Sequence, residues 1–230
     1  MTVIPPHTRP PLNDVEFPAV EVTYPDSDGA PMAETDIHVT LIAMLLLMLR
    51  TFFRTRPDVY VAGNMFVYYQ DGNPRRVVSP DLFIVYGVPT HYRRPWFTWK
   101  EGKGLDVVFE FTSESTAEAD QFTKKGLYEW LGVKEYFLFD PLDEYLKPRL
   151  QGFRLVDGVY QPIPLVGGQL QSEVLGLTLN AEKEMLTLTV AQTGERLLPP
   201  GEEAVARRKA EAEVERLRAE LERLKATKKD

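Results

Sequence analysis

One apolar helix followed by short runs of strand-forming residues is the feature of this 230-residue sequence that most restricts its fold. The segment from Glu34 to Phe53 holds no glycine or proline and is strongly apolar, which predicts a largely buried helix with Thr35 or Asp36 as its N-cap. Runs rich in β-branched and aromatic residues then predict strands at 58–63, 65–74, 77–86 and 105–111.

The next part of the chain predicts a second helix and one more buried strand. Ser115 and Glu118 have the spacing of a capping box, so we expect a helix to start there and to run to about Leu131. Gly132 suits the left-handed residue that ends a helix, and the apolar run 134–141 predicts a strand. The sequence therefore predicts an α/β fold with a core in the order helix, three strands, helix, strand.

Composition divides the chain into three parts. Residues 1–31 hold seven of the 18 prolines and predict an extended arm. Residues 32–194 form the predicted domain, which continues after its core with a hairpin at Asp157-Gly158 and two weaker strands. Residues 195–230 consist mainly of Glu, Arg, Lys and Ala and predict a charged helix.

The charged C-terminal segment carries a narrow apolar seam. Its members recur at spacings of 4, 3, 4 and 3, at Ala210, Val214, Leu217, Leu221 and Leu224. The seam is shorter than the three or four heptads that identify a coiled coil, so a solvated single helix and a short coiled coil fit it about equally. We favour the coiled coil, and with it a homo-oligomer that is most simply a dimer.

Composition also excludes several classes of site. The chain has no cysteine, which excludes disulfides, thiol catalysis and Cys-based zinc sites, and its three histidines are scattered. The longest apolar run, 41–49, is too short to cross a bilayer, and the first residues do not resemble a signal peptide. We therefore expect a cytoplasmic protein with no membrane partner. The net charge of -7 argues mildly against a large basic surface for nucleic acid.

Two carboxylates stand in strongly apolar strands. Asp81 follows Pro80 at the head of the run LFIVY, and Glu110 lies within VVFEF, where strand alternation puts it on the face of Thr112. Two such carboxylates close together repel unless a cation lies between them, and Mg²⁺ or Mn²⁺ suits hard oxygen ligands. Taken alone, Asp81 is more typical of a turn aspartate, and Glu110 has the alternative of pairing with a buried Arg or Lys.

Three stretches of this sequence resemble a known nuclease family: SPDLFIVYGVP, FEFTSESTAEADQFTKKGLYEWLGVKEYFLFDP and LQGFRLVDGVYQPI. They are similar to the Uma-type putative restriction endonuclease family of the PD-(D/E)XK nuclease superfamily, over residues 34 to about 165. The resemblance implies a restriction-endonuclease-like core in which Asp81 and Glu110 hold a catalytic Mg²⁺ or Mn²⁺ and DNA is the substrate.

The chain departs from the superfamily at one position of the signature. A lysine is expected two residues after the glutamate, and Thr112 stands there. The resemblance implies that the lysine has moved onto the helix as Lys124, four residues after Asp120 and on the same helical face. Many of these nucleases also use a glutamate of the first helix, for which Glu34 is the nearest candidate. From the residues alone, Asp120 and Lys124 are more typical of an ion pair on a helix surface.

The segment 91–103 mixes basic and aromatic residues, a combination that can bind nucleic acid. We favour a packed loop whose aromatic rings cover the edge of the sheet.

The sequence thus predicts a Mg²⁺-dependent endonuclease that hydrolyses phosphodiester bonds in DNA. The alternative is a non-catalytic module that keeps the nuclease fold and assembles through its C-terminal helix. In the first case the candidate residues are Asp81 and Glu110 as metal ligands and catalytic groups, Lys124 as a third catalytic group, and Glu34, Asp120 and Thr112 as additional candidates.

Overall fold

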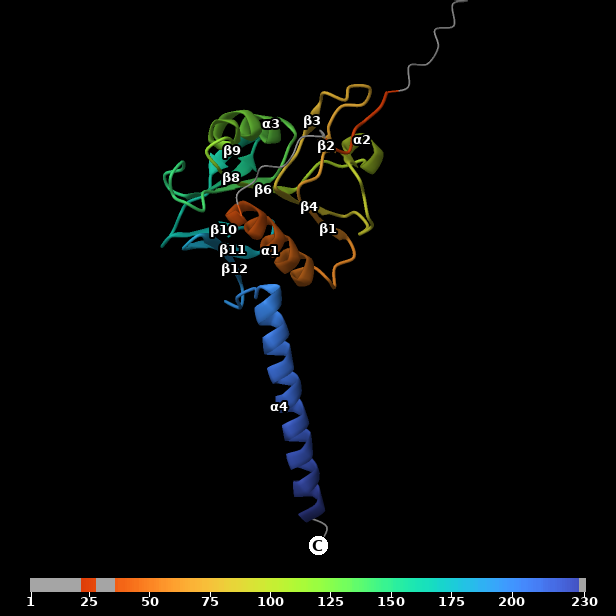
Figure 1. Cartoon of the computed structure of the whole chain (residues 1–230), viewed down its shortest axis with the longest axis vertical. Helices are drawn as coiled ribbons and strands as arrows, with labels where there is room; N and C mark the ends of the chain where they lie inside the picture. The colour runs from red at the N-terminus through yellow and green to blue at the C-terminus, as the bar shows by residue number, and fades with distance from the viewer. Residues whose placement is uncertain (1–21, 28–35, 228–230) are drawn as a thin grey trace, which may run out of the picture.

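A six-stranded sheet forms the centre of the computed structural model, which describes residues 22–27 and 36–227 without the side chains at 220, 222 and 224–227 (Figure 1). All neighbouring strands are antiparallel except β6 and β7, which run parallel. In spatial order the strands are β1 (Val59–Ala62), β4 (Leu82–Tyr86), β6 (Val107–Phe111), β7 (Glu135–Phe139), β8 (Leu150–Val156) and β9 (Val159–Pro162).

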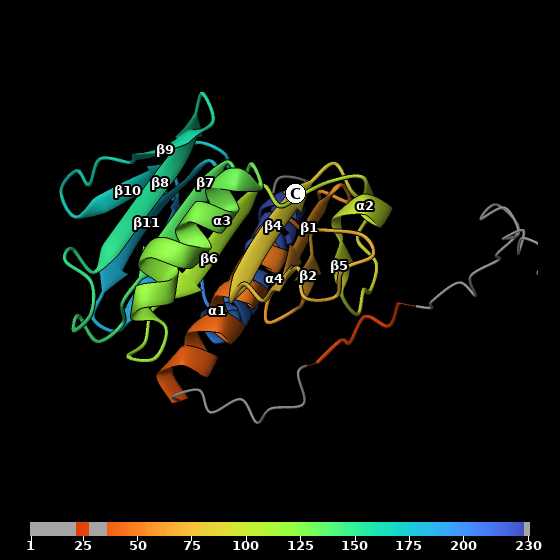
Figure 2. The ribbon, with the colours of Figure 1, turned by 90° about the horizontal axis from the view of Figure 1, so that it is seen from above.

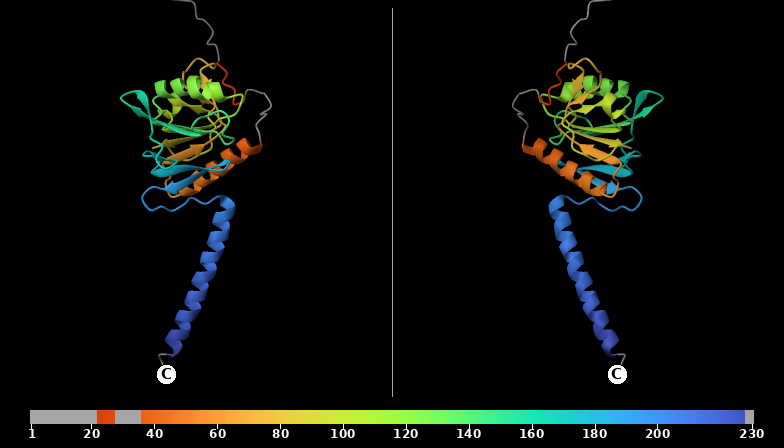
Figure 3. Two further views of the ribbon diagram at one scale, coloured as in Figure 1. Left: turned by 90° about the vertical axis from the view of Figure 1, so that its left-hand side faces the viewer. Right: turned by 90° about the vertical axis from the view of Figure 1, so that its right-hand side faces the viewer.

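Different elements cover the two faces of this sheet (Figures 2 and 3). The helix α1 (Asp36–Phe52) and a second sheet cover one face, and the π-helical turn η2 (Ala119–Lys124) with the helix α3 (Lys125–Trp130) covers the other. Residues Phe109 and Phe111 of β6 pack in the core on the α1 side, whereas Val108 packs with Tyr128 of α3. The predicted alternation along this strand is therefore confirmed.

The α/β class and the core order are confirmed, with β1, β4 and β6 as the three strands before the second helix. The expected strand 65–74 was wrong in extent and place. Only β2 (Val67–Tyr68) forms there, and it pairs with β3 (Val77–Val78) and, in parallel, with β5 (Trp96–Phe97) in a small separate sheet. The reason is that β4 pairs directly with β1, which leaves no position between them for β2.

The segment 91–103 is packed as expected. Trp96 is fully buried and its ring stacks on that of Tyr60 at a centroid distance of 5.5 Å, and the short helix α2 (Thr98–Glu101) follows. The part of the predicted arm that is described, residues 22–27, lies against the small sheet, where the ring of Tyr24 packs edge-on against Tyr68. The remainder of the arm lies outside the described residues.

The second helix starts at residue 117 and includes a π-helical turn that the sequence did not indicate. The expected capping box does not form, because the hydroxyl of Ser115 lies 3.3 Å from that of Ser113. The Ser113 carbonyl accepts from the N–H of Ala117, and the Ser113 N–H donates to the hydroxyl of Thr116. Gly132 has a φ of 76° and follows the helix as predicted.

Three strands, rather than the two expected, follow the hairpin at Asp157-Gly158. They are β10 (Gln169–Ser172), β11 (Leu177–Glu182) and β12 (Met185–Val190), and they form the second sheet. The last helix, α4 (Pro200–Thr227), then projects away from the body of the molecule (Figure 1). Within the described ranges, no helix is long and apolar enough to cross a membrane.

Candidate active site

Asp81 lies directly before β4, where its carboxylate is held from two sides. Its Oδ2 accepts a hydrogen bond of 2.7 Å from the backbone N–H of Phe111 in β6 and lies 3.2 Å from Nε2 of His38 in α1. The side chain is 14% exposed, and its other oxygen, Oδ1, accepts no hydrogen bond from the part of the chain that is described. Asp81 thus keeps one oxygen for a ligand.

The backbone around Asp81 is fixed by the end of β1. The N–H of Asn64 donates to the carbonyl oxygens of Pro80 and Asp81, at 3.1 and 3.2 Å. Gly63 lies so close that a Cβ atom at this position would collide with the carbonyl oxygen of Asp81. Pro80 has no N–H to pair, which suits its place before the first residue of a strand. The turn at Gly63-Asn64 therefore determines where Asp81 lies.

Glu110 is fully buried beneath α3 and both of its carboxylate oxygens have donors. The Tyr128 hydroxyl donates to Oε1 at 2.6 Å, and the Lys124 ammonium donates to Oε2 at 2.8 Å. A buried carboxylate is tolerated only when it is paired and hydrogen-bonded, as it is here. Each carboxylate oxygen has two lone pairs, so Glu110 retains acceptor capacity for a further ligand.

Lys124 connects Glu110 to a second buried acid. Its Nζ lies 2.9 Å from Oδ1 of Asp120, whose side chain is 1% exposed, and the backbone carbonyl of Asp120 accepts from the Tyr136 hydroxyl at 2.9 Å. Asp120 and Lys124 therefore do not form a surface ion pair, because Asp120 is buried. The lysine instead bridges two carboxylates at the end of the sheet.

The acids in this cluster hold protons more tightly than exposed acids do. Burial, and then the negative charge of Asp81, raise the pKa of Glu110 well above its ordinary value, although Lys124 opposes this shift. Burial also raises the pKa of Asp120. Burial lowers the pKa of Lys124, but Glu110 and Asp120 outweigh burial and the net shift is upward, which keeps the ammonium protonated.

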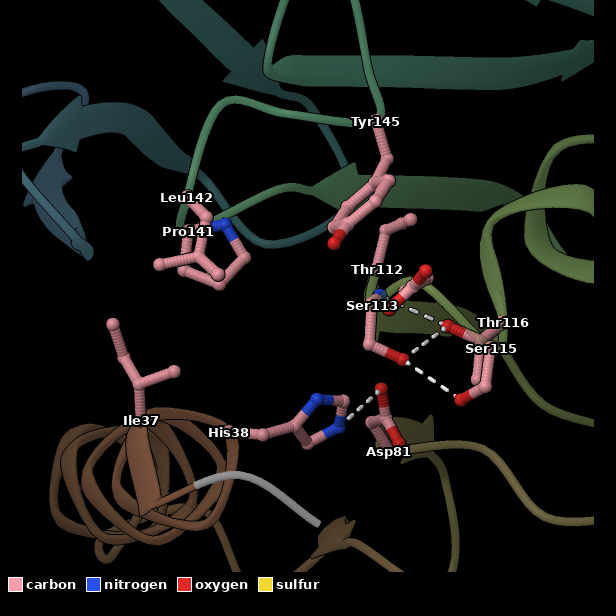
Figure 4. Close-up of a pocket in the computed structure, with 11 residues that line it drawn as sticks. Ile37, His38, Asp81, Thr112, Ser113, Ser115, Thr116, Pro141, Leu142 and Tyr145 are labelled. Atoms are coloured by element: carbon pink, nitrogen blue, oxygen red, sulfur yellow. Dashed lines mark hydrogen bonds and ion pairs between the residues drawn. The ribbon is translucent and has the colours of Figure 1, made fainter.

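A pocket of about 420 Å³ opens beside Asp81 (Figure 4). Asp81, His38 and the turn of Ser113 and Ser115 face it from one side, and Tyr145 lies across from them. Its wall also includes Thr112, Thr116, Glu114, Ile37, Pro141 and Leu142, whereas Glu110 and Lys124 do not line it.

Thr112 occupies the signature-lysine position and its hydroxyl has no partner. The residue is 2% exposed, and its Oγ1 is buried without a hydrogen bond to any described group. A buried hydroxyl without a partner is uncommon in a folded protein and calls for an explanation. Thr112 also belongs to the wall of the pocket beside Asp81.

The donor set suits a hard divalent cation. Mg²⁺ binds through one or two carboxylates and keeps several waters, so Asp81 with Glu110 is enough. The repulsion from Asp81 that raises the pKa of Glu110 is relieved by a cation near both. Among the described residues, no group of three or more His, Cys, Asp or Glu side chains is placed to hold a metal ion. The chemistry fits an open site in which water completes the coordination.

Five of the six candidate residues are described, in two groups: Asp81 and Thr112 line the pocket, and Glu110, Lys124 and Asp120 form the buried cluster. Glu34 lies outside the described residues. His38, one of the three scattered histidines, contacts Asp81, and Tyr128 contacts Glu110. The signal for Tyr128 was present in the sequence, since Asp120, Lys124 and Tyr128 are spaced by four residues and share one helical face. The hydroxyls of Ser113 and Thr116 organise the turn at the helix start.

Comparison with known proteins finds similarity to putative nucleases. The model of the family Uma2, described as putative restriction endonuclease, matches residues 16–190. Among solved structures, the chain is similar to a putative nuclease belonging to DUF820 from Anabaena variabilis ATCC 29413, with 11% identity, 63% of this chain and 76% of that chain covered, and a TM-score of 0.47. No curated protein matches the chain. The family match spans Asp81, Glu110 and Lys124.

Proposed function

The chain belongs to the Uma2 family of putative restriction endonucleases, and from this membership and the geometry of the cluster we propose that it is a divalent-metal-dependent endonuclease that hydrolyses phosphodiester bonds in DNA. The observation that carries the proposal is the Lys124 ammonium bridging the buried carboxylates of Glu110 and Asp120, together with Asp81, whose Oδ1 accepts no hydrogen bond from the described residues. A fold that needed only stability has no reason to gather three acids at one end of its sheet, because breaking such buried pairs is costly and forming them gains little.

Asp81 and Glu110 would hold the metal ion. When bound, Mg²⁺ or Mn²⁺ neutralises phosphate charge and lowers the pKa of a water molecule, which favours attack on phosphorus. In the reaction the water oxygen forms a bond to phosphorus while the ester P–O bond breaks, and the leaving oxygen takes up a proton.

The remaining residues act on charge and position. The protonated Lys124 supplies positive charge near the negative charge that develops on the phosphate, the task of the signature lysine in this superfamily. Tyr128 orients Glu110 through its hydrogen bond, and His38 and the Phe111 N–H orient Asp81. Thr112 lines the pocket, and its Oγ1 is buried without a hydrogen bond to any described group.

Incubation of supercoiled plasmid DNA with the protein and Mn²⁺ tests this proposal. We expect nicked or linear product from the wild type, none with EDTA, and none from Asp81→Asn or Lys124→Met. Asp58→Asn is the matched control. Asp58 is half-exposed and pairs with Arg56, and it lies directly before Val59, at the end of β1 away from Gly63 and Asp81. Undiminished cleavage by Asp81→Asn would place the reaction elsewhere.

Thermal unfolding with Mn²⁺ separates an enzyme from a non-catalytic module. A ligand that binds only the folded state stabilises it by about 2.7 kcal/mol at one hundred times its Kd. We expect Mn²⁺ to raise the melting temperature of the wild type and of Asp58→Asn but not that of Asp81→Asn. A wild type that neither gains stability from Mn²⁺ nor cuts DNA would favour the non-catalytic alternative.

A further inference from the structure

The helix α4 presents an exposed apolar seam far from the body of the molecule. Val214, Leu217 and Leu221 are 45%, 52% and 52% exposed. Figures 1 and 3 show the helix leaving the body near its first turns and continuing alone. We propose that the seam binds the same seam of a second copy of this chain, in a parallel two-stranded coiled coil.

The seam has the residue types of a dimeric coil. With Val214 and Leu221 at a positions, Ala210 and Leu217 fall at d positions, and the sequence places Leu224 at the next d. A β-branched residue at a with leucine at d favours two strands in parallel coils, and Val214 with Leu217 has this pattern, whereas Leu221 is a leucine at the second a position. A helix with a seam on one side and charges elsewhere buries that seam only against a partner.

The charges that flank the seam favour the parallel orientation. In parallel dimers a residue at g faces the residue five positions later, at e, on the other helix. This pairs Glu213 with Arg218, which in the single chain pair with Arg216 and Glu215 of their own helix, and the sequence spacing pairs Glu220 with Lys225, so both pairs have opposite charges. In an antiparallel dimer g positions face each other, which would bring Glu213 against Glu220. The pattern therefore specifies direction as well as partner.

The place of the seam leaves room for two bodies. Residues 200–209 lie between the body and the first seam residue, Ala210, and at 1.5 Å per residue they form a helical spacer of about 15 Å. Because the helices run parallel, both bodies lie at the same end of the dimer. The assembly does not depend on the proposed nuclease activity.

Cysteine cross-linking tests the orientation, since the chain has no cysteine of its own. Ala210→Cys and Leu217→Cys place a thiol at two d positions, and Ala212→Cys and Ala219→Cys are the matched controls at outward positions two residues away. Under mild oxidation of the full chain we expect disulfide-linked dimers from both d variants and at most a small fraction from the controls. Circular dichroism of each variant checks that it is folded.

Each other outcome overturns the proposal. Cross-linking at only one d position would indicate an antiparallel pair, because antiparallel helices bring a residue against its own copy only at their midpoint. Equal yields from the d variants and the controls would indicate a solvated single helix, even if light scattering of the wild type gave the mass of a dimer. We expect that mass to rise from one chain to two with concentration, since the seam is short.

Discussion

Thr112 combines a buried hydroxyl with the lack of any hydrogen-bond partner among the described residues. We expect Thr112→Val, which keeps the shape and removes the hydroxyl, to raise the free energy of unfolding by about 1 kcal/mol, because an unsatisfied buried polar group costs about 1–3 kcal/mol. If the hydroxyl contacts the substrate, cleavage should fall at the same time. Urea unfolding and plasmid cleavage measure the two effects.

Thr187→Val is the matched control for this substitution. Thr187 is also buried, but its hydroxyl lies 3.2 Å from the carbonyl of Asn180 and 3.2 Å from Glu182. Loss of these contacts should lower stability. If Thr112→Val lowers stability as Thr187→Val does, the Thr112 hydroxyl is paired in solution and its role in the pocket is lost.

Glu110 gives the metal-free protein a specific dependence on pH. Its pKa is raised by burial and by Asp81, so the folded state holds this proton more tightly than the unfolded state. Wherever the folded state binds more protons, stability falls as pH rises, here from the ordinary value of 4.5 upward to the raised value. The raised pKa of Lys124 gives stability that is complete below its ordinary value of 10.5, so it does not change over this range.

Glu110→Gln should therefore reduce the loss of stability that the wild type shows as the pH rises. Measured in EDTA, the free energy of unfolding of the variant relative to the wild type should be lowest near pH 4.5 and should rise toward pH 8, while the variant loses the stabilisation by Mn²⁺. Asp120 titrates in the same direction in both proteins, so the difference between them isolates Glu110. A difference that stays constant with pH would mean that Glu110 has an ordinary pKa.

At the scale of elements, Gly63 and Asn64, which follow β1, fix the position of Asp81 directly before β4. We expect Gly63→Ala to lower Mn²⁺ affinity without removing a ligand, since its Cβ would collide with the carbonyl of Asp81 and the backbone there has to move. Gly126→Ala is the control, because nothing lies near its Cβ within α3 and alanine favours a helix by about 0.5–1 kcal/mol. Calorimetric titration of both variants with Mn²⁺ measures the effect; equal affinities would show that the turn adapts.

The elements also show what sequence reasoning can and cannot reach. The helix α1 and the strands β4, β6 and β7 were predictable, because runs that are buried on both faces carry a local signal in their composition. The position of β2 was not predictable, since its residues suit any sheet. Only the direct pairing of β4 with β1 excludes β2 from the six-stranded sheet. The π-helical turn and the contact of His38 with Asp81 depend on packing between segments distant in sequence.

At the scale of the whole molecule, the body contains both hydrophobic cores and α4 adds little to either. The last residue of the cores is Leu197, before α4 begins. Leu41, Leu45 and Leu49 of α1 are almost completely buried inside the body, and only Val39 and Leu47 of this helix remain as exposed large apolar residues in the described range. The proposed assembly and the proposed metal site therefore involve separate parts of the chain.

Removal of residues 205–230 should separate these two properties. The shortened chain keeps every residue of both cores and of the candidate site, so we expect an unchanged fold by circular dichroism and the same rise in melting temperature with Mn²⁺ as in the full chain. It loses the seam from Ala210 to Leu224, so light scattering should give the mass of one chain at concentrations where the full chain gives two.

Because an enzyme that cuts both strands of a duplex commonly uses two sites, the shortened chain should nick plasmid DNA where the full chain makes it linear. A dimer that persists after truncation would assign the interface to the body and leave α4 as a solvated helix.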